Sequence, residues 1–514
     1  MGSIKFNKKN NRRKRILPGK DHYSGLVIYN NTLPAGFSDV DNIITPETKA
    51  TSTSAVTTIG NDDNVILVFV PEPGGIVHLA EYKKVAGDNT AAKVATAIAN
   101  AINAHPSGYT AVAAGANYTV TARPGLGTSI NGIAVTHAST DNSFVGTSVV
   151  FAGGTDVVTG TTPTGRVQLI NDIDAAVTAG ITANNADVGI QRMHYHISEV
   201  FRMNPDAVLY VGIFAVPVGA HTFSEISTVR TFANNQLRQV GVFTPKAYNN
   251  ADCALLQDMY DAAFDEYAPF EILYSPNFVG IATGALADLS GKNAPDVHLL
   301  IAQDGAAAGA ALFAATPANS VGIIGAVLGA LSLAKVNENI GWVEKFNFAE
   351  DGGELDVPAL ANGDLIQNLS VNLTKNGGTF DTKRLMFLKK YPGQTGTFLN
   401  DTHGACPANR DDAFIEDNRT LDKAIRGIYL ALLPNVNGPT LLLPGTSKLD
   451  PLAISLLELD AKKVLEQMQN AGELSGYSVT IDPDQDVVAT NKIVFEISNT
   501  EIGVSRNFEI NIGY

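Results

Sequence analysis

The last 13 residues of the chain alternate between two kinds of side chain, and this alternation constrains the fold more than any other feature. The even-numbered positions are apolar except for one arginine: Ile502, Val504, Arg506, Phe508, Ile510, Ile512 and Tyr514. The odd-numbered positions carry small or polar side chains, of which Glu509 is the only charged one. Because successive side chains of a β-strand point to opposite faces, the pattern predicts a strand of roughly 40 Å at about 3.3 Å per residue.

A terminal strand of this length needs a partner. Typical strands have about 5–6 residues, and an unpaired edge with an exposed apolar face is costly. One interpretation is an edge strand within its own domain; the other is a strand exchanged with another copy of the chain. The length favours exchange, because it exceeds what one small sheet usually covers.

Composition indicates a globular chain in a reducing compartment. Of its 514 residues, 45% are hydrophobic and 17% are charged, which is typical of several folded domains. Cys253 and Cys406 are too few for a disulfide framework. No apolar stretch follows the basic first residues, so we expect no signal peptide. Residues 321–336 are apolar but are interrupted by three glycines and Lys335, which predicts a closely packed buried helix and no membrane insertion.

The charge is unevenly distributed. Residues 1–25 hold eight Lys or Arg against one acid, a net charge of +7, whereas the remainder carries −22. A basic arm on an acidic body can bind nucleic acid or dock on an identical copy. Few aromatic residues are interleaved with the basic ones, which favours docking on another copy of the chain. We therefore expect no nucleic-acid partner.

Composition and periodicity change along the chain and together predict an α/β and α+β multidomain fold. Residues 45–160 consist mostly of short β-runs rich in Thr, Ala and Gly, with one helix over 90–104, and read as an inserted β-rich α+β module. Residues 165–350 alternate helices and buried strands, which predicts a mixed sheet flanked by helices. Residues 351–500 are looser and contain two amphipathic helices, so we expect a separate C-terminal domain there.

No sequence motif indicates enzymatic chemistry. Nucleophile-elbow, P-loop and HExxH patterns are missing, and His194 and His196 would point apart on a helix. Four acids, Asp411, Asp412, Glu416 and Asp417, cluster just before a helix expected over residues 420–432, where solvated carboxylates are common. We therefore expect no catalytic, metal or cofactor site.

A lysine pair marks the long helix expected over residues 449–469. Lys462 and Lys463 lie side by side in a strongly acidic body. They form either a solvated polar face or a docking element for an acidic partner, with salt-sensitive attraction.

Three stretches together resemble a known family. Residues 193–205 (MHYHISEVFRMNP), 320–342 (SVGIIGAVLGALSLAKVNENIGW) and 491–514 (NKIVFEISNTEIGVSRNFEINIGY) are similar to contractile tail sheath proteins of Mu-like phages and bacterial contractile injection systems. The resemblance implies a helical polymer around an inner tube protein, which contracts to drive the tube through a target envelope. Further implied partners are baseplate and terminator proteins. The expected place is a phage tail or tail-like particle assembled in the bacterial cytoplasm.

The resemblance also implies roles for particular segments. Residues 1–30 and 502–514 would be linking arms lent to adjacent copies, through Tyr23, Leu26, Val27, Ile28 and Tyr29 at one end and the alternating positions at the other. Arg506 would form an inter-subunit salt bridge. Residues 351–500 would face the tube through Lys462 and Lys463, and module 45–160 would lie on the outer surface. The alternative is another self-assembling structural protein, such as a tail tube, baseplate or surface-layer subunit.

Overall fold

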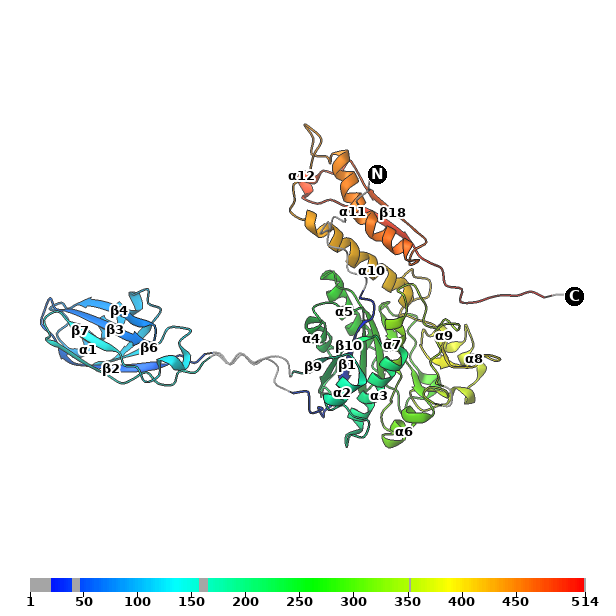
Figure 1. The fold of residues 1–514 in the computed structure, drawn as a ribbon, viewed down its shortest axis with the longest axis horizontal. Helices are drawn as coiled ribbons and strands as arrows, with labels where there is room; N and C mark the ends of the chain where they lie inside the picture. Colours follow the sequence, from blue (N-terminus) through cyan, green and yellow to red (C-terminus); the bar gives the residue numbers. More distant parts are fainter. Residues whose placement is uncertain (1–19, 39–46, 157–164, 351–352, 513–514) are drawn as a thin grey trace, which may run out of the picture. The chain divides into compact units, whose positions relative to one another are not determined.

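The computed structural model describes residues 20–38, 47–156, 165–350 and 353–512. The basic residues 5–15 and Tyr514 therefore lie outside the described residues. The chain divides into two compact units, unit 1 with residues 1–39 and 164–514, and unit 2 with residues 40–163 (Figure 1). The module expected at 45–160 lies within unit 2.

A six-stranded mixed sheet forms the centre of unit 1, in the order β13-β12-β11-β1-β10-β9. All neighbours are parallel except β9, which is antiparallel to β10. The strands are β1 (Tyr23–Tyr29), β9 (Val167–Ile170), β10 (Val208–Phe214), β11 (Gln239–Ala247), β12 (Glu271–Asn277) and β13 (Val297–Leu299). This agrees with the mixed sheet expected for residues 165–350, with one added strand from the N-terminal end.

That added strand, β1, corrects one expectation. β1 pairs with β10 on one side and with β11 on the other, so both of its edges are occupied within the same chain. Its apolar run is buried on both faces, with Leu26, Val27, Ile28 and Tyr29 at most 2% exposed, as is typical of a central parallel strand. Tyr23–Tyr29 is therefore a core strand of its own subunit and leaves no edge to lend.

Helices cover both faces of this sheet. They are α2 (Ile173–Thr178), α3 (Val188–Met203), α4 (Glu225–Phe232), α5 (Asp252–Asp265) and α7 (Ile324–Leu333). A further helix, α6 (Ala307–Ala315), packs on α3. A Cβ at Gly25 would meet Val229 of α4, whereas a Cβ at Gly241, on the opposite face, would meet Leu328 of α7. All of α7 except its last residue is buried, which confirms the closely packed helix expected there.

The boundary expected near residue 351 is absent from the structure. Leu385, Phe387, Leu399 and Ile415 belong to the same core as the central sheet. Short strands hold this region to the body: β14 (Ala302–Asp304) pairs with β15 (Pro358–Leu360), and β16 (Leu388–Lys389) with β17 (Phe398–Leu399). α8 (Val371–Thr374) and α9 (Thr379–Thr382) complete it. The turn-rich sequence suggested a domain boundary here, but loop-rich segments can still bury apolar side chains in a neighbouring core.

The elements after residue 415 have a small core of their own. They are α10 (Ile415–Leu432), α11 (Pro451–Asn470), β18 (Gly476–Ile481), α12 (Val487–Thr490) and β19 (Phe495–Thr500). Ala424, Ala461, Leu465 and Met468 pack together under β18. Asp450 caps α11 by accepting a hydrogen bond from the Leu452 amide at 2.8 Å, and Pro451 lies in the first turn, where proline is tolerated.

Unit 2 has a separate core built from two sheets and one helix. One sheet has the order β5-β6-β2-β8 and the other β4-β3-β7. The elements are β2 (Thr51–Ile59), β3 (Val65–Glu72), β4 (Gly75–Lys83), α1 (Ala91–Ala104), β5 (Thr110–Ala114), β6 (Asn117–Thr121), β7 (Thr136–Ser139) and β8 (Phe144–Ser148). Ile98 and Ile102 of α1 are buried, as expected from the periodicity of 90–104. Across the described ranges, no helix is long and apolar enough to span a bilayer.

Candidate functional site: the C-terminal groove and tail

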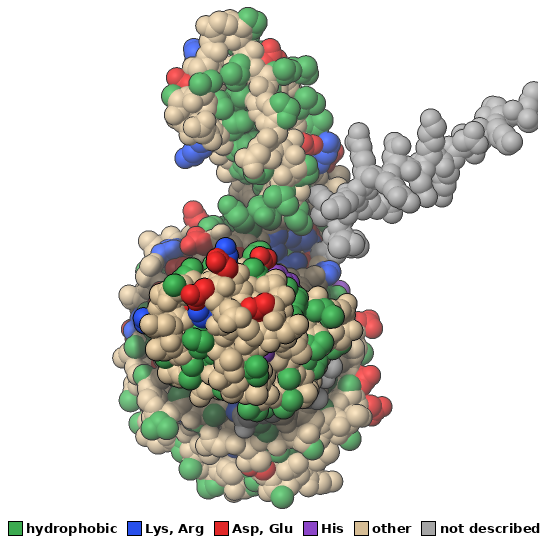
Figure 2. All heavy atoms as spheres, turned by 90° about the vertical axis from the view of Figure 1, so that its left-hand side faces the viewer, with side chains coloured by type: hydrophobic (Ala, Val, Ile, Leu, Met, Phe, Trp, Pro, Cys, Tyr) green, Lys and Arg blue, Asp and Glu red, His purple; other side chains and the backbone are tan. Residues whose placement is uncertain are grey.

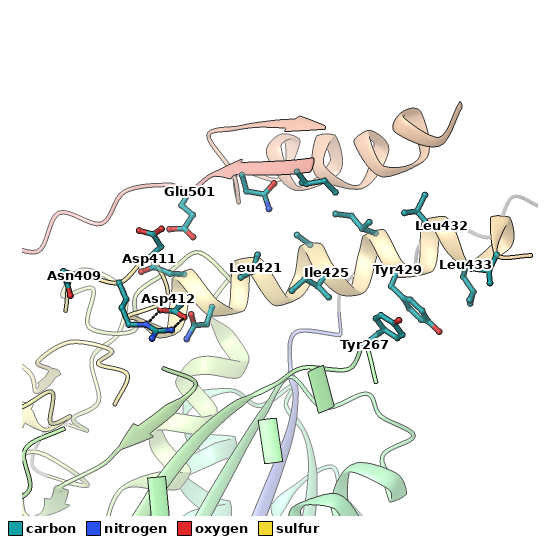
Figure 3. Close-up of a pocket in the computed structure, with 18 residues that line it drawn as sticks. Tyr267, Asn409, Asp411, Asp412, Leu421, Ile425, Tyr429, Leu432, Leu433 and Glu501 are labelled. Carbon is teal, nitrogen blue, oxygen red and sulfur yellow. Dashed lines mark hydrogen bonds and ion pairs between the residues drawn. The ribbon is translucent and has the colours of Figure 1, made fainter. Parts of the chain in front are cut away.

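A groove of about 960 Å³ lies between α10 and β19 (Figure 3). Its long wall is apolar and comes from α10, including Leu421, Ile425 and Ile428, while Ile497 of β19 lines the other side. Asp411, Asp412, Asp417 and Glu501 gather at one end. The groove thus offers an apolar floor with an acidic end.

The groove exists because α10 and α11 support a sheet that is narrower than the helix pair. β18 and β19 form a two-stranded antiparallel sheet, and β18 packs on α11. Within the described part of the chain, β19 pairs only with β18. Leu421 on α10, which lines the groove, consequently remains 45% exposed. A free strand edge beside an apolar helix is the arrangement that accepts an added strand.

The tail after β19 is extended but forms no strand within the chain. Residues 501–512 have no regular secondary structure and no sheet partner among the described residues (Figure 1). Phe508, Ile510 and Ile512 are 82%, 75% and 88% exposed. The interpretation as an edge strand of its own domain is therefore wrong, whereas exchange with another copy remains a prediction.

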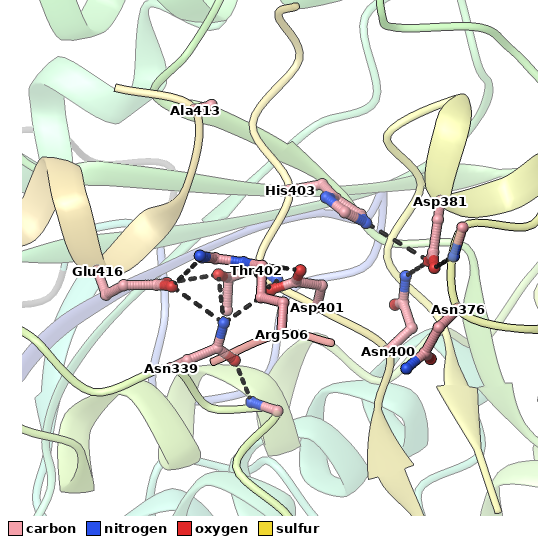
Figure 4. A network of polar contacts seen from close by, with 12 residues as sticks. Asn339, Asn376, Asp381, Asn400, Asp401, Thr402, His403, Ala413, Glu416 and Arg506 are labelled. Carbon is pink, nitrogen blue, oxygen red and sulfur yellow. Dashed lines mark hydrogen bonds and ion pairs between the residues drawn. The ribbon is translucent and has the colours of Figure 1, made fainter. Parts of the chain in front are cut away.

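Arg506 is held by its own subunit (Figure 4). Its Nε atom donates to Asp401 Oδ2 at 3.0 Å, its Nη2 atom donates to Glu416, and its guanidinium carbon lies 3.4 Å from the centroid of the Phe414 ring. Asn339 donates to both acids, at 2.7 Å to Asp401 and 3.0 Å to Glu416. The expected inter-subunit salt bridge is thus corrected to an intramolecular one. Sequence alone gave no signal for these partners, which lie 90 or more positions away.

Burial perturbs the carboxyl groups around the start of the tail. Desolvation, with repulsion from Asp401, raises the pKa of Glu416 to about 7, although Arg506 opposes this shift. Desolvation and the charge of Glu501 likewise raise the pKa of Asp417 to about 7. The side chains of Asp417 and Glu501 are hydrogen bonded to each other, and this contact contributes to the raised pKa of Asp417. Of the four acids expected to be solvated, Glu416 is buried, with a side chain only 2% exposed.

The lysine pair of α11 is paired within its own helix. Lys462 contacts Glu458 at 2.7 Å and Lys463 contacts Asp460 at 3.0 Å, and the lysine side chains are 39% and 44% exposed. Their charge is therefore partly neutralised. An exposed apolar stripe runs along the same helix through Leu452, Leu456 and Leu459, which are 57%, 54% and 47% exposed. Figure 2 shows hydrophobic side chains at the surface of these C-terminal elements.

The remaining candidates for chemistry fall into the core. His194 and His196 both lie on α3, and His196 is fully buried beside Phe243, so the pair shares no open site. Both cysteines are free and buried. Over the described ranges, no cluster of three or more His, Cys, Asp or Glu has a geometry that fits a metal ion.

Comparisons with known proteins give one partial family match and several structural neighbours. The family model "DUF2586, C-terminal domain" matches residues 411–514, and no curated protein matches the chain. The structural neighbours include contractile sheath proteins. The anti-feeding prophage helical sheath in its contracted state is 12% identical, with a TM-score of 0.47, covering 68% of this chain and 88% of that one. A sheath tail protein from Desulfitobacterium hafniense is 10% identical, with a TM-score of 0.36, covering 97% and 100%. The anti-feeding prophage baseplate in its contracted state is 14% identical, with a TM-score of 0.42, covering 68% and 89%.

Proposed function

We propose that this chain is a structural subunit that polymerises with copies of itself into a contractile sheath, each tail adding a strand to the β19 edge of another copy. One observation carries the proposal: the chain has both an unpaired strand edge beside an apolar groove and an unpaired alternating tail. A groove that lacks a strand and a tail that lacks a sheet are complementary, and in a polymer each copy supplies both.

The energetics favour assembly over a single pairwise contact. Burying Phe508, Ile510 and Ile512 is worth about 1.5–3 kcal/mol each, and main-chain hydrogen bonds fix direction and register. Association costs about 4–15 kcal/mol of binding free energy, because the partners lose translational and rotational freedom. One tail in one groove therefore gives only modest affinity. A lattice in which every subunit donates and accepts a strand multiplies the contacts.

The finer parts of the proposal rest on the sequence resemblance. The polymer would surround an inner tube protein, meet baseplate and terminator proteins at its ends, and belong to a phage tail or tail-like particle assembled in the bacterial cytoplasm. Contraction would run downhill from a metastable extended state, without nucleotide hydrolysis and without an enzymatic role for this chain. Unit 2, with its own core, would be an insertion on the outer surface.

Electron microscopy of the purified chain tests the proposal. We expect the wild-type chain to form tubes with helical symmetry, and Ile425→Glu to prevent them, because this half-buried side chain lines the apolar groove wall. Val488→Glu, at an exposed position outside the groove, is the matched control and should leave the tubes intact. Circular dichroism checks that each variant is folded.

Two outcomes would contradict the proposal in different ways. Tubes formed normally by folded Ile425→Glu would exclude the groove as the acceptor site. Flat arrays, or closed rings that never stack, would instead favour the alternative, another self-assembling structural protein.

We further predict that α11 contributes to binding of the inner tube. Replacing Lys462 and Lys463 with Glu turns two intrahelical ion pairs into two pairs of like charges. It should therefore weaken co-sedimentation with the tube by about tenfold while sparing self-assembly. Lys448→Glu, which also breaks an exposed ion pair, is the matched control. Unchanged tube binding by the double variant would show that α11 does not dock on the tube.

A further inference from the structure

We propose that Arg506 divides the tail into a held segment, residues 502–506, which stays on its own subunit, and a donor segment, residues 507–512, which alone is available to another copy. This inference rests on the proposed function and identifies which residues of the tail act as the added strand. It replaces the 13-residue strand expected from the alternation by a shorter one.

Exposure changes at Arg506. Ile502, Val504 and Arg506 are partly buried, whereas all six residues from Asn507 to Ile512 are exposed. The even-numbered face therefore lies against the subunit up to Arg506 and leaves it immediately afterwards. Because the alternation itself continues unchanged, the division is made by contacts and not by the pattern.

Contacts at both ends fix the held segment. At its start, Ser475 donates from its amide to the Thr500 carbonyl and from its hydroxyl to the Glu501 carbonyl, each at 2.9 Å. At its end, the Arg506 guanidinium is shared by Asp401 and Glu416, whose side chains are only 14% and 2% exposed. A charged hydrogen bond with a desolvated carboxylate is worth more than an exposed ion pair.

Lending the whole tail would require this cluster to be dismantled. Glu416 would lose its only cationic partner among the described ion pairs, and leaving a buried charge without its partner is strongly destabilising. Arg506 also lies on the same face of the alternation as Val504 and Phe508, so in a continuous strand its guanidinium would face the apolar wall of α10. Burying an unpaired charge there is costly.

The donor segment has the length that the acceptor edge requires. Residues 507–512 span roughly 20 Å at about 3.3 Å per residue, and β19 is a strand of six residues. Phe508, Ile510 and Ile512 are spaced two apart, so they face the same side of an added strand. The described residues after Arg506 are therefore enough to pair along the whole of β19.

Spin labelling of the full-length chain, at a concentration below that at which it assembles, tests the held segment in the monomer. Ser505→Cys and Asn511→Cys are labelled separately with a nitroxide, while Cys253 and Cys406 are buried. We expect slow motion at position 505 and fast motion at 511, and Arg506→Gln should shorten the correlation time at 505 by about threefold or more. Arg506→Lys keeps the charge but loses the two-pronged guanidinium contact, so its correlation time at 505 should lie between those of the wild type and Arg506→Gln. Equal mobility at the two positions in the wild type, or no change in Arg506→Gln, would overturn the inference.

Peptide binding tests the donor segment. Labelled peptides 507–514 and 502–514 are titrated by fluorescence polarisation into a chain that ends at Arg506. We expect dissociation constants equal within about twofold, because only residues after Arg506 add to the sheet. Binding about tenfold tighter by the longer peptide would overturn the division of the tail. Binding by neither peptide would overturn the donor role and the proposed strand addition together, and the spin labels would still report on the held segment.

Discussion

A chain that ends at Arg506 is expected to fold normally and to form no polymer. The truncation removes Phe508, Ile510 and Ile512, which are at least 75% exposed in the subunit and therefore contribute little to its stability. In the polymer the same side chains would be buried on α10, so their loss should raise the critical concentration by about 100-fold or more. Sedimentation velocity and negative-stain microscopy measure this.

A variant on the other face of the tail is the control for this truncation. Glu509→Gln with Asn511→Ser changes two odd-numbered side chains and preserves the apolar face, so assembly should persist. Tubes of normal appearance from the truncated chain would show that residues 507–514 are not the link between copies.

Gly325→Ala is expected to destabilise unit 1 by about 3 kcal/mol or more. A Cβ at this position would lie 2.0 Å from the carbonyl oxygen of His196, a backbone atom of α3. Relief requires α3 and α7 to separate, which opens the core on one face of the central sheet. Urea unfolding monitored at Trp342, the single tryptophan of the chain, reports on unit 1 alone.

Gly291→Ala serves as the comparison, because a Cβ there meets no atom within 4 Å. Its stability should stay within about 0.5 kcal/mol of the wild type. If Gly325→Ala unfolds at the same urea concentration as Gly291→Ala, the close packing of α3 against α7 is not a determinant of stability.

Local periodicity correctly predicted several elements. The helix over 90–104, the proline-started helix over 449–469 and the buried, glycine-rich helix beginning near residue 321 correspond to α1, α11 and α7. The βα alternation of 165–350 gave the central mixed sheet. These properties depend on residues within one or two turns or one strand, which the sequence shows directly.

Partners distant in the sequence could not be read in the same way. β1 lies between β10 and β11, whose residues are more than 180 positions away, so an isolated apolar strand looked like a free arm. Residues 353–415 looked loose because their turns are conspicuous, yet they share the core of the body. In both cases burial by another part of the chain decided the outcome, and no local pattern encodes it.

The C-terminal tail combines a local sequence pattern with contacts to distant parts of the chain. The amino-acid order alone shows that residues 502–514 alternate and that Arg506 is the exception, because side-chain order along an extended backbone is a local property. That Arg506 binds Asp401 and Glu416 of its own subunit, and that the groove beside β19 lacks a strand, is visible only in the folded chain. Those features arise where distant chain segments meet, 90 or more positions apart for the Arg506 contacts. The free energy of such contacts depends on burial and charge partners that exist only in the folded subunit.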